Sequence, residues 1–366
     1  MSLTNKAAPD SIRNAAWLYP ECTHRRAFRI HIAYLVYGIN IAKYFFSVYL
    51  SDFAEANTEF PSFTQAVGQV RMSQPAIGLE VKFESRKSSL NETHGMELKY
   101  FLRSTNTYVG ESDYNWYHLY WGNPTESYSH ASSDVWGEES AVYNLADLTD
   151  VTGRTSTLTA YNGPTVGVAT SQLGGSRVFN GTSQYLECTS SNKFQYGIGQ
   201  FSWGMWAKST TSIRYEVGLY KYGSGYGFYG YKIDNSGNVW RAAVHNGDTL
   251  YADSALWNTA WTYYSFSRDN SGNVVFYING ISQDTGNTSQ TVNNTGLLGI
   301  GRNNGSVGGY WLGEIEHVWL SPYSIISEGY DVLPYNSMAN GANFWVWDTA
   351  GTQLKVGALP LLLAQV

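Results

Sequence analysis

The sequence predicts an all-β protein built from two antiparallel β-sandwich domains. Short runs in which apolar and polar residues alternate recur along the chain, and this is the pattern of strands with one buried face. Aromatic residues make up 16% of the chain and charged residues only 14%. The 37 glycines far outnumber the 9 prolines, as in proteins whose short strands are separated by glycine turns.

The N-terminal part of the chain is predicted to hold a polar arm at residues 1–20 and a first β-sandwich at residues 21–134. A Gly-Asn-Pro turn at 122–124 ends the last strand-like run, and the Ser-rich stretch after it is the predicted linker. The strand-like runs of this domain are Phe28–Tyr37, Phe45–Leu50, Leu79–Phe83, Met96–Leu102 and Trp116–Trp121.

Residues 135–335 are predicted to form the second sandwich. The hexapeptide Asp-Asn-Ser-Gly-Asn-Val occurs at 234–239 and again at 269–274, each time between apolar runs. Its Asp, Asn and Gly residues tolerate positive φ, so each copy predicts a β-hairpin turn. The alternating runs are Ala141–Leu145, Arg177–Glu187, Phe201–Lys208, Trp261–Arg268, Val274–Gly280, Leu298–Arg302 and Gly313–Leu320.

Residues 336–366 are predicted to form a C-terminal strand and a docking tail. The segment Asn343–Asp348 alternates as an amphipathic strand, and Leu359–Leu363 is a short apolar end. Because that end is too short to span a membrane, we expect it to dock on this chain or on a partner subunit.

Charge, hydropathy and cysteine content exclude several classes of protein. The net charge of −6 excludes a nucleic-acid binder, which needs a basic stripe. The most apolar stretch, Ile30–Leu50, contains polar residues and predicts two strands and no membrane span. The polar residues 1–20 lack the apolar core of a signal peptide, so no export signal is expected. Cys22 and Cys188 are too few for a disulfide framework and are predicted to be free thiols.

Four short motifs occur in order along the second domain. They are Asp150–Gly153, Phe179–Gly181, Trp261 and Tyr277–Gly280. Through these motifs, residues 135–335 resemble the concanavalin A-like, laminin G-type jelly rolls of bacterial and phage proteins. The resemblance implies a jelly roll whose task is binding, because domains of this type rarely transform what they bind.

Three further segments frame the first domain. They are an Arg-containing strand at Arg25–Arg29, an exit strand at Tyr120–Pro124, and the segment Tyr335–Ser337 after the second domain. Through them the first domain is similar to a bacterial and phage domain of unknown function that often precedes such jelly rolls. The similarity names no ligand, since one fold hosts many functions.

No catalytic set is predicted. Glu314 and Glu316 resemble acids of the Glu-x-Asp-x-x-Glu strand of jelly-roll glycosidases, whose retaining members hold two carboxyls about 5 Å apart. Trp319 stands where the final acid would be, and alternation is expected to point His317 away from the face of Glu316. The acids are therefore interpreted as ordinary residues of the last strand, and the protein as non-enzymatic.

Aromatic residues between 215 and 240 form the candidate ligand-binding site. Pyranose rings have apolar C–H faces that stack on Tyr and Trp, while polar groups bind the hydroxyls. Alternation sends Phe228 away from Tyr229. Phe201, Phe228 and Phe266 are assigned to the core, and packing in the core or at a sheet edge is also the alternative for the other aromatic residues. The candidate ligand-binding residues are Tyr220, Tyr222, Tyr229, Tyr231 and Trp240.

Calcium is the candidate cofactor. Lectin-like sandwiches often hold Ca²⁺ through carboxylates and carbonyls of their loops, at distances of about 2.4 Å. Asp147 and Asp150, near the entry to the second domain, are the candidate ligands, and Asp234 or Asp248 lies in a loop that could add oxygens. The alternative role of all four is to cap turns.

The sequence therefore predicts a non-enzymatic bacteriophage virion surface protein, such as a fibre, a spike or a capsid decoration, whose jelly roll binds host-surface glycan. Such a protein folds in the host cytoplasm and leaves by lysis, which needs no export signal. The expected partners are capsid or tail proteins, host-surface carbohydrate, and further copies of the chain in a homo-oligomer. The alternatives are a purely structural decoration or assembly module, a secreted bacterial adhesin, and a glycan-processing enzyme.

Overall fold

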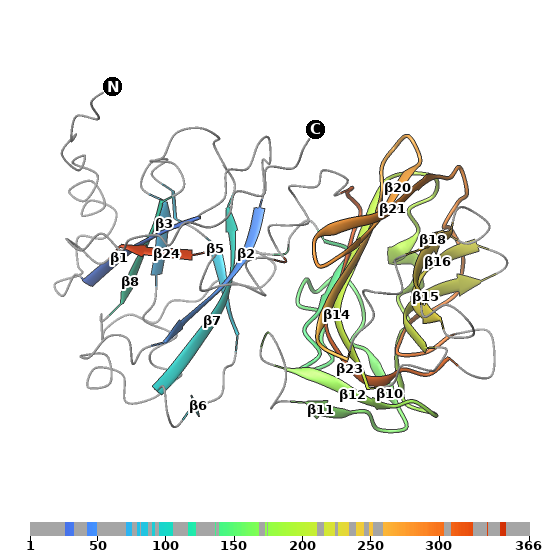
Figure 1. Ribbon diagram of the computed structural model, residues 1–366, viewed down its shortest axis with the longest axis horizontal. Helices are drawn as coiled ribbons and strands as arrows, with labels where there is room; N and C mark the ends of the chain where they lie inside the picture. Colours follow the sequence, from blue (N-terminus) through green and yellow to red (C-terminus); the bar gives the residue numbers. More distant parts are fainter. Residues whose placement is uncertain are drawn as a thin grey trace. The chain divides into compact units, whose positions relative to one another are not determined.

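The computed structural model divides the chain into two compact units, residues 1–135 together with 336–366, and residues 136–335 (Figure 1). In the first unit only the backbones of strands are described. The described residues are 26–32, 42–49, 71–74, 79–80, 82–86, 90–91, 95–104, 116–121, 136, 139–167, 173, 175–210, 216–223, 226–233, 239–244, 249–251, 259–303, 309–324, 335 and 345–348.

The described strands of the first unit form two antiparallel sheets. One has the order β24-β1-β8-β3-β4, and the other has the order β2-β7-β5, with β6 paired to β7. Strand β24 joins its sheet through β1, where Arg29 lies opposite Asp348. The strand bounds are β1 Arg26–Ile32, β2 Ala42–Tyr49, β3 Arg71–Gln74, β4 Leu79–Glu80, β5 Lys82–Arg86, β6 Leu90–Asn91, β7 Gly95–Ser104, β8 Trp116–Trp121 and β24 Trp345–Asp348.

The second unit is a sandwich of two antiparallel sheets. The seven-stranded sheet has the order β10-β13-β22-β15-β16-β17-β18, and the eight-stranded sheet has the order β11-β12-β23-β14-β19-β20-β21, with β9 paired to β23. Figure 1 shows β15, β16 and β18 in one layer and β14 and β23 in the other. The strand bounds are β9 Ala141–Tyr143, β10 Thr159–Tyr161, β11 Thr165–Gly167, β12 Ser176–Asn180, β13 Tyr185–Cys188, β14 Phe201–Ser209, β15 Glu216–Gly223, β16 Tyr226–Ile233, β17 Val239–Val244, β18 Thr249–Tyr251, β19 Thr262–Arg268, β20 Asn273–Ile278, β21 Ile281–Asn287, β22 Leu298–Ile300 and β23 Leu312–Ser321.

The predicted all-β fold class is confirmed. The regular elements in the described part of the chain are strands, apart from a short 3-10 helix at Ser191–Phe194. None of the helical residues described belongs to a helix long and apolar enough to cross a membrane.

Large side chains of one sheet face glycines of the other across the core. Trp203 and Met205 project inward from β14 toward Gly230 of β16 and Gly218 of β15. A Cβ atom at Gly230 would stand 2.3 Å from the Trp203 ring. One at Gly218 would stand 2.4 Å from the Met205 methyl carbon. The two glycines therefore make room for the large side chains, and the sheets pack closely around them.

The three phenylalanines assigned to the core lie there, as predicted. Phe201, Phe228 and Phe266 are fully buried. The Phe201 ring lies 5.3 Å from the Phe228 ring and 5.7 Å from the Phe266 ring, which is the spacing of favourable aromatic pairs. Tyr229, the next residue after Phe228 in β16, is only half-buried, so alternation holds along this strand.

The outer face of the eight-stranded sheet is covered. Trp206 and Tyr263 lie on this face, yet both are almost fully buried. The Tyr335 ring stacks on them, with centroid distances of 5.8 Å and 6.4 Å. Ser202 Oγ donates a hydrogen bond of 2.6 Å to the carbonyl oxygen of Tyr323. Because residues that follow β23 pack against this face, the outer face of the seven-stranded sheet is the better surface for a ligand.

Lys221 of β15 is a buried cation at the end of the core. Its Nζ donates two hydrogen bonds of 3.1 Å to Asn294, one to the backbone oxygen and one to Oδ1. Burial lowers the pKa of Lys221 to about 8, because the apolar surroundings disfavour the charged amine.

This lowered pKa makes stability depend on pH in the alkaline range. The unfolded chain holds the Lys221 proton up to a pKa of about 10.4, whereas the folded chain releases it near 8, so stability rises as the pH increases between these values. We expect wild type to gain on the order of 2–3 kcal/mol relative to Lys221→Met between pH 7.5 and pH 10. Urea denaturation at both values measures this gain, and an unchanged difference between the two proteins would contradict it.

Candidate functional site

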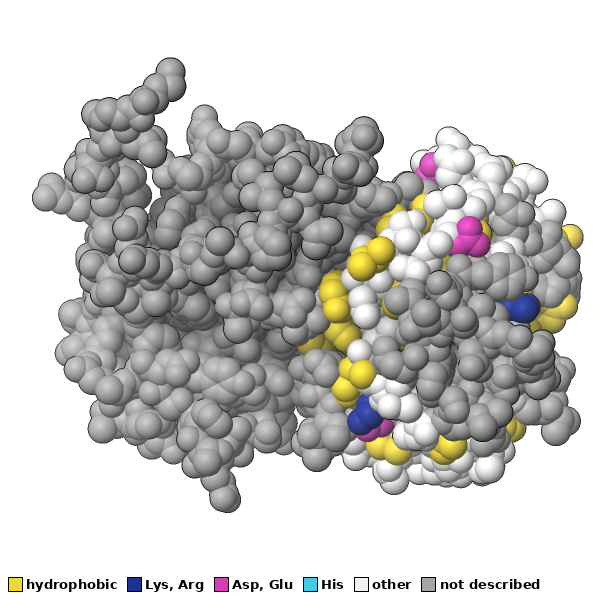
Figure 2. All heavy atoms as spheres, viewed as in Figure 1, with side chains coloured by type: hydrophobic (Ala, Val, Ile, Leu, Met, Phe, Trp, Pro, Cys, Tyr) yellow, Lys and Arg dark blue, Asp and Glu magenta, His cyan; other side chains and the backbone are white. Residues whose placement is uncertain are grey.

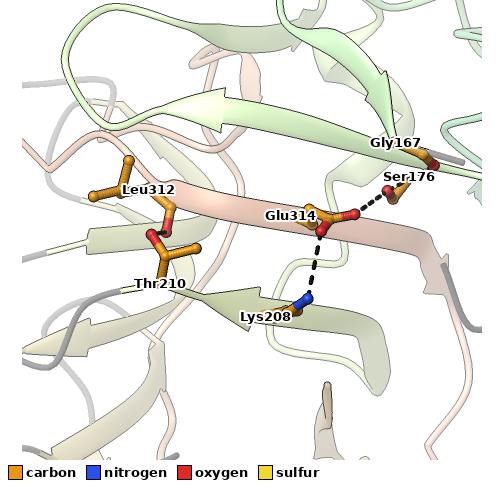
Figure 3. A network of polar contacts seen from close by, with 6 residues as sticks. All are labelled: Gly167, Ser176, Lys208, Thr210, Leu312 and Glu314. Carbon is orange, nitrogen blue, oxygen red and sulfur yellow. Dashed lines mark hydrogen bonds and ion pairs between the residues drawn. The ribbon is translucent and has the colours of Figure 1, made fainter. Parts of the chain in front are cut away.

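The two acids of β23 are held by the fold. Figure 3 shows Glu314 between Ser176 of β12 and Lys208 of β14. Ser176 Oγ donates a hydrogen bond of 2.7 Å to Glu314 Oε2, and Lys208 Nζ lies 3.6 Å from Oε1. Glu316 is fully buried and accepts a hydrogen bond of 2.7 Å from the Leu173 N–H. Both carboxylates are thus bound by donors of the protein itself, which suits a structural role.

A bulge in β23 corrects the expected direction of His317. Trp206 of β14 pairs with Glu316 of β23, and Gly204 pairs with Trp319. Between these two pairs β14 advances by two residues and β23 by three, so β23 carries one extra residue. His317 has φ of 50°, in the left-handed region. The inward residues around it are Ile315 and Val318, three positions apart. The strict alternation that predicted opposite faces for Glu316 and His317 is therefore interrupted.

Three of the five predicted ligand-binding residues come together on the outer face of the seven-stranded sheet. The Tyr220 ring of β15 lies 5.7 Å from the Tyr222 ring and 6.2 Å from the Tyr229 ring of β16. Tyr220 is nearly buried, with 8% of its surface exposed, whereas Tyr222 and Tyr229 are half-buried. These three residues are called the tyrosine cluster below.

The structure corrects the prediction for Trp240 and leaves Tyr231 open. In β17, Ala243 lies opposite Tyr229 on the outer face, so Trp240, three residues earlier, faces the core. Its ring lies 4.0 Å from the Tyr264 ring, and only 3% of its surface is exposed. Trp240 is therefore a core residue and not a ligand contact. The side chain of Tyr231 lies outside the described residues.

A second group of aromatic residues lies on the same face and is not predicted from the sequence. The Tyr161 ring of the edge strand β10 stacks on the Tyr185 ring of β13, with a centroid distance of 4.4 Å and an interplanar angle of 9°. The Arg302 guanidinium lies 3.6 Å from the centre of the Tyr185 ring and 3.0 Å from Glu187 Oε2. The Tyr161 ring and the Arg302 guanidinium are both too close to the Tyr185 ring to lie on the same face of it, so Tyr185 lies between them. We call these four residues the tyrosine–arginine stack.

The two groups are separated by a single glycine. Glu187 of β13 lies opposite Gly299 of β22, and Gly299 lies opposite Tyr220 of β15. With a strand spacing of about 4.8 Å, the backbones of Glu187 and Tyr220 are about 10 Å apart. Gly299 is buried, and Arg302 lies over it: the Arg302 backbone oxygen and Cγ would stand 3.6 Å and 3.8 Å from a Cβ atom at this glycine. The two groups therefore lie next to each other on one face of the sheet.

Asp150 is a structural anchor, which corrects its assignment as a calcium ligand. The residue is buried, with 3% of its surface exposed, and a ligand would have to displace the donors that surround it. Those donors are the N–H groups of Val142, Thr152, Arg154 and Thr155 and the hydroxyls of Thr152 and Thr155.

Asp147 is the second predicted calcium ligand, and its side chain caps a turn. It is exposed and accepts a hydrogen bond of 2.9 Å from the Thr149 N–H. Within the part of the chain that the structure describes, no group of three or more His, Cys, Asp or Glu side chains could hold a metal ion. Asp234 and Asp248 lie outside that part.

One family model matches the second unit. It describes the concanavalin A-like lectin/glucanases superfamily and covers residues 180–328, which include the tyrosine cluster and most of the tyrosine–arginine stack. Residues 180–328 form a concanavalin A-like domain of the laminin G type. The resemblance of the first unit to a domain of unknown function stays a prediction. No curated protein matches the chain.

Several solved structures are similar to this chain. Domain 4 of AbnA, a GH43 extracellular arabinanase from Geobacillus stearothermophilus solved with arabinotriose, is 19% identical over 54% of this chain and 98% of its own, with a TM-score of 0.43. The binding domain of Paraclostridial Mosquitocidal Protein 1 is 11% identical over 56% of this chain and 53% of its own, with a TM-score of 0.45. The botulinum neurotoxin serotype D/C VPI 5993 binding domain is 13% identical over 56% of this chain and 53% of its own, also with a TM-score of 0.45. The chain thus spans about half the length of the two toxin structures.

The anchoring role of Asp150 predicts a large loss of stability on substitution. In Asp150→Asn either orientation of the amide turns its NH₂ group toward donors, so we expect a loss of about 3 kcal/mol. The exposed Asp147→Asn is the matched control and should change stability by less than about 0.5 kcal/mol. Urea denaturation measures both. Equal effects of the two substitutions would contradict the assignment.

Proposed function

We propose that the protein is a non-enzymatic glycan-binding protein, and that its second unit binds carbohydrate on the outer face of the seven-stranded sheet. The tyrosine cluster is the observation that carries this proposal. Its rings lie side by side on a sheet face, where the partly exposed Tyr222 and Tyr229 present aromatic surface beside the nearly buried Tyr220. A pyranose ring can stack on such a surface, because it has apolar C–H faces beside its rim of hydroxyls.

The surroundings of the acids support binding without turnover. A retaining glycosidase needs one carboxylate free to attack and one carboxylic acid free to donate a proton, about 5 Å apart. Glu314 instead contacts Lys208 and Ser176, and Glu316 is buried against backbone N–H groups. Figure 2 shows few charged side chains among the described residues of that view.

The setting that we propose is the surface of a bacteriophage virion, as a fibre, a spike or a capsid decoration. The ligand is then host-surface carbohydrate, and the partners are capsid or tail proteins and further copies of the chain. The support for this setting is the resemblance of the sequence motifs in the two units to those of bacterial and phage domains. Adsorption of the labelled full-length chain to a panel of bacterial strains tests it. Binding to particular strains, inhibited by their purified polysaccharide, is the expected result, and silence on every strain would contradict it.

Substitutions in the tyrosine cluster test the proposed surface. We expect Tyr222→Ala and Tyr229→Ala to weaken binding to an immobilised glycan panel about tenfold each, or about 1.4 kcal/mol, because each removes part of the stacking surface. Glu314→Gln is the matched control for catalysis and should leave glycan binding unchanged. Release of reducing sugar by wild type, and its loss in Glu314→Gln, would overturn the non-enzymatic assignment.

A further inference from the structure

We propose that the edge of the seven-stranded sheet carries a second carbohydrate subsite, built on Tyr161 and suited to uncharged sugars. This inference rests on the proposed function and deepens it. It assigns a role to the tyrosine–arginine stack, and it makes the ligand an oligosaccharide of uncharged units.

The Tyr161 ring is a supported and exposed platform. One face of the ring stacks on Tyr185, whose opposite face is covered by the Arg302 guanidinium. Among the strands that the structure describes, β10 is the last of the seven-stranded sheet, so Tyr161 stands at the edge of that sheet. The residue is 38% exposed, in contrast to the 8% of Tyr220. A ring fixed on one side and open on the other is pre-organised for stacking, which lowers the entropy lost on binding.

The turn after Tyr161 is fixed by side-chain hydrogen bonds. Asn162 and Gly163 have φ of 56° and 66°, a conformation that an Asn-Gly pair adopts readily. Asn162 Nδ2 donates to the carbonyl of Ser183 at 2.8 Å. Gln184 Nε2 donates to the carbonyls of Asn162 and Gly163 at 3.0 Å and 2.9 Å. The platform and the polar residues beside it therefore keep a defined arrangement.

The same hydrogen bonds select what remains for a ligand. Gln184 donates to two carbonyls of the protein and Asn162 donates to one, and the side-chain carbonyl oxygens of both residues can accept hydrogen bonds from a ligand. Amide oxygens accept hydrogen bonds from sugar hydroxyls. An aromatic platform with acceptor oxygens at its rim is the combination that an amphipathic sugar ring requires.

Charge pairing at this edge favours an uncharged sugar. The Arg302 guanidinium is bound to Glu187 at 3.0 Å. Arg177 donates a hydrogen bond to the carbonyl of Pro164. The Arg302 cation behind the platform thus has an acidic partner, and an anionic sugar would have to compete with Glu187 for it.

This subsite and the tyrosine cluster lie on the same face of the seven-stranded sheet. In the row from β13 to β15, Gly299 pairs with both Glu187 and Tyr220, and Arg302 lies over this glycine. A glycan chain that runs across the strands can therefore contact Tyr161 and the tyrosine cluster together. This arrangement predicts that oligosaccharides bind more tightly than single sugars.

Calorimetric titration of the full-length chain tests the inference. The probes are uncharged tetrasaccharides of glucose, mannose, galactose and arabinose, their monosaccharides, and tetragalacturonate as a charged probe. We expect an uncharged tetrasaccharide to bind best and Tyr161→Ala to weaken its binding about tenfold. Tyr161→Phe keeps the ring and should bind nearly as wild type. Tyr323→Ala, at a tyrosine that is 50% exposed elsewhere, is the matched control and should have no effect.

The outcomes separate this inference from the proposed function. If Tyr161→Ala binds as wild type while Tyr222→Ala binds weakly, the second subsite is wrong and glycan binding stands. Tighter binding of tetragalacturonate overturns the preference for uncharged sugars. If no saccharide binds wild type, the proposed function and this inference both fail. Circular dichroism melting of each variant shows whether a loss of binding reflects a loss of folding.

Discussion

The close fit between large side chains of one sheet and glycines of the other fixes the second unit. Trp203 and Met205 of β14 occupy the space that a side chain at Gly230 or Gly218 would need. This contact sets which residues of β15 and β16 point inward. Tyr229 is adjacent to Gly230 in the chain, so it must point outward. The ligand-binding face that we propose is therefore a consequence of how the core packs.

The two outer faces of the sandwich differ for a physical reason. On the eight-stranded sheet, Trp206 and Tyr263 are large aromatic residues, and Tyr335 packs over them. This removes their apolar surface from water, so these two rings are not available to stack on a ligand. On the seven-stranded sheet, Tyr161, Tyr222 and other tyrosines keep partial exposure. A tyrosine at such a surface costs little, because its hydroxyl stays hydrated, and it keeps an apolar ring available.

The sequence was sufficient for the parts that depend on local pattern. Alternation and turn residues predicted strands β9, β14, β19, β20, β22 and β23, the core position of Phe228 and the outward position of Tyr229. They did not predict the short strands β10, β11 and β18 or the strand β21, and the run at 177–187 is divided between β12 and β13. Trp240 was misplaced because its direction depends on the register between β16 and β17, and one residue of register reverses every side chain. The bulge at His317 likewise interrupts the alternation of inward and outward side chains, and one extra residue in a strand has no recognisable signature in the sequence.

Non-local pairing accounts for what the sequence did not reveal. The stack of Tyr161 on Tyr185 depends on the pairing of β10 with β13, and Arg302 reaches it from beyond the end of β22. No spacing along the chain predicts that these residues meet. The sequence predicts Asp150 as a calcium ligand. In the folded loop its carboxylate is buried and accepts hydrogen bonds from six groups of the protein, which the sequence does not reveal.

Tyrosine reactivity gives the most direct measure of the two outer faces. Nitration of the folded full-length chain with tetranitromethane, followed by peptide mass mapping, ranks the tyrosines by exposure. Among the tyrosines of the two outer faces, Tyr161, Tyr222 and Tyr229 should react before Tyr263 and Tyr277, which are buried and should react only after unfolding. If Tyr263 and Tyr277 react as fast as Tyr161 in the folded protein, the assignment of the seven-stranded sheet as the binding face is contradicted.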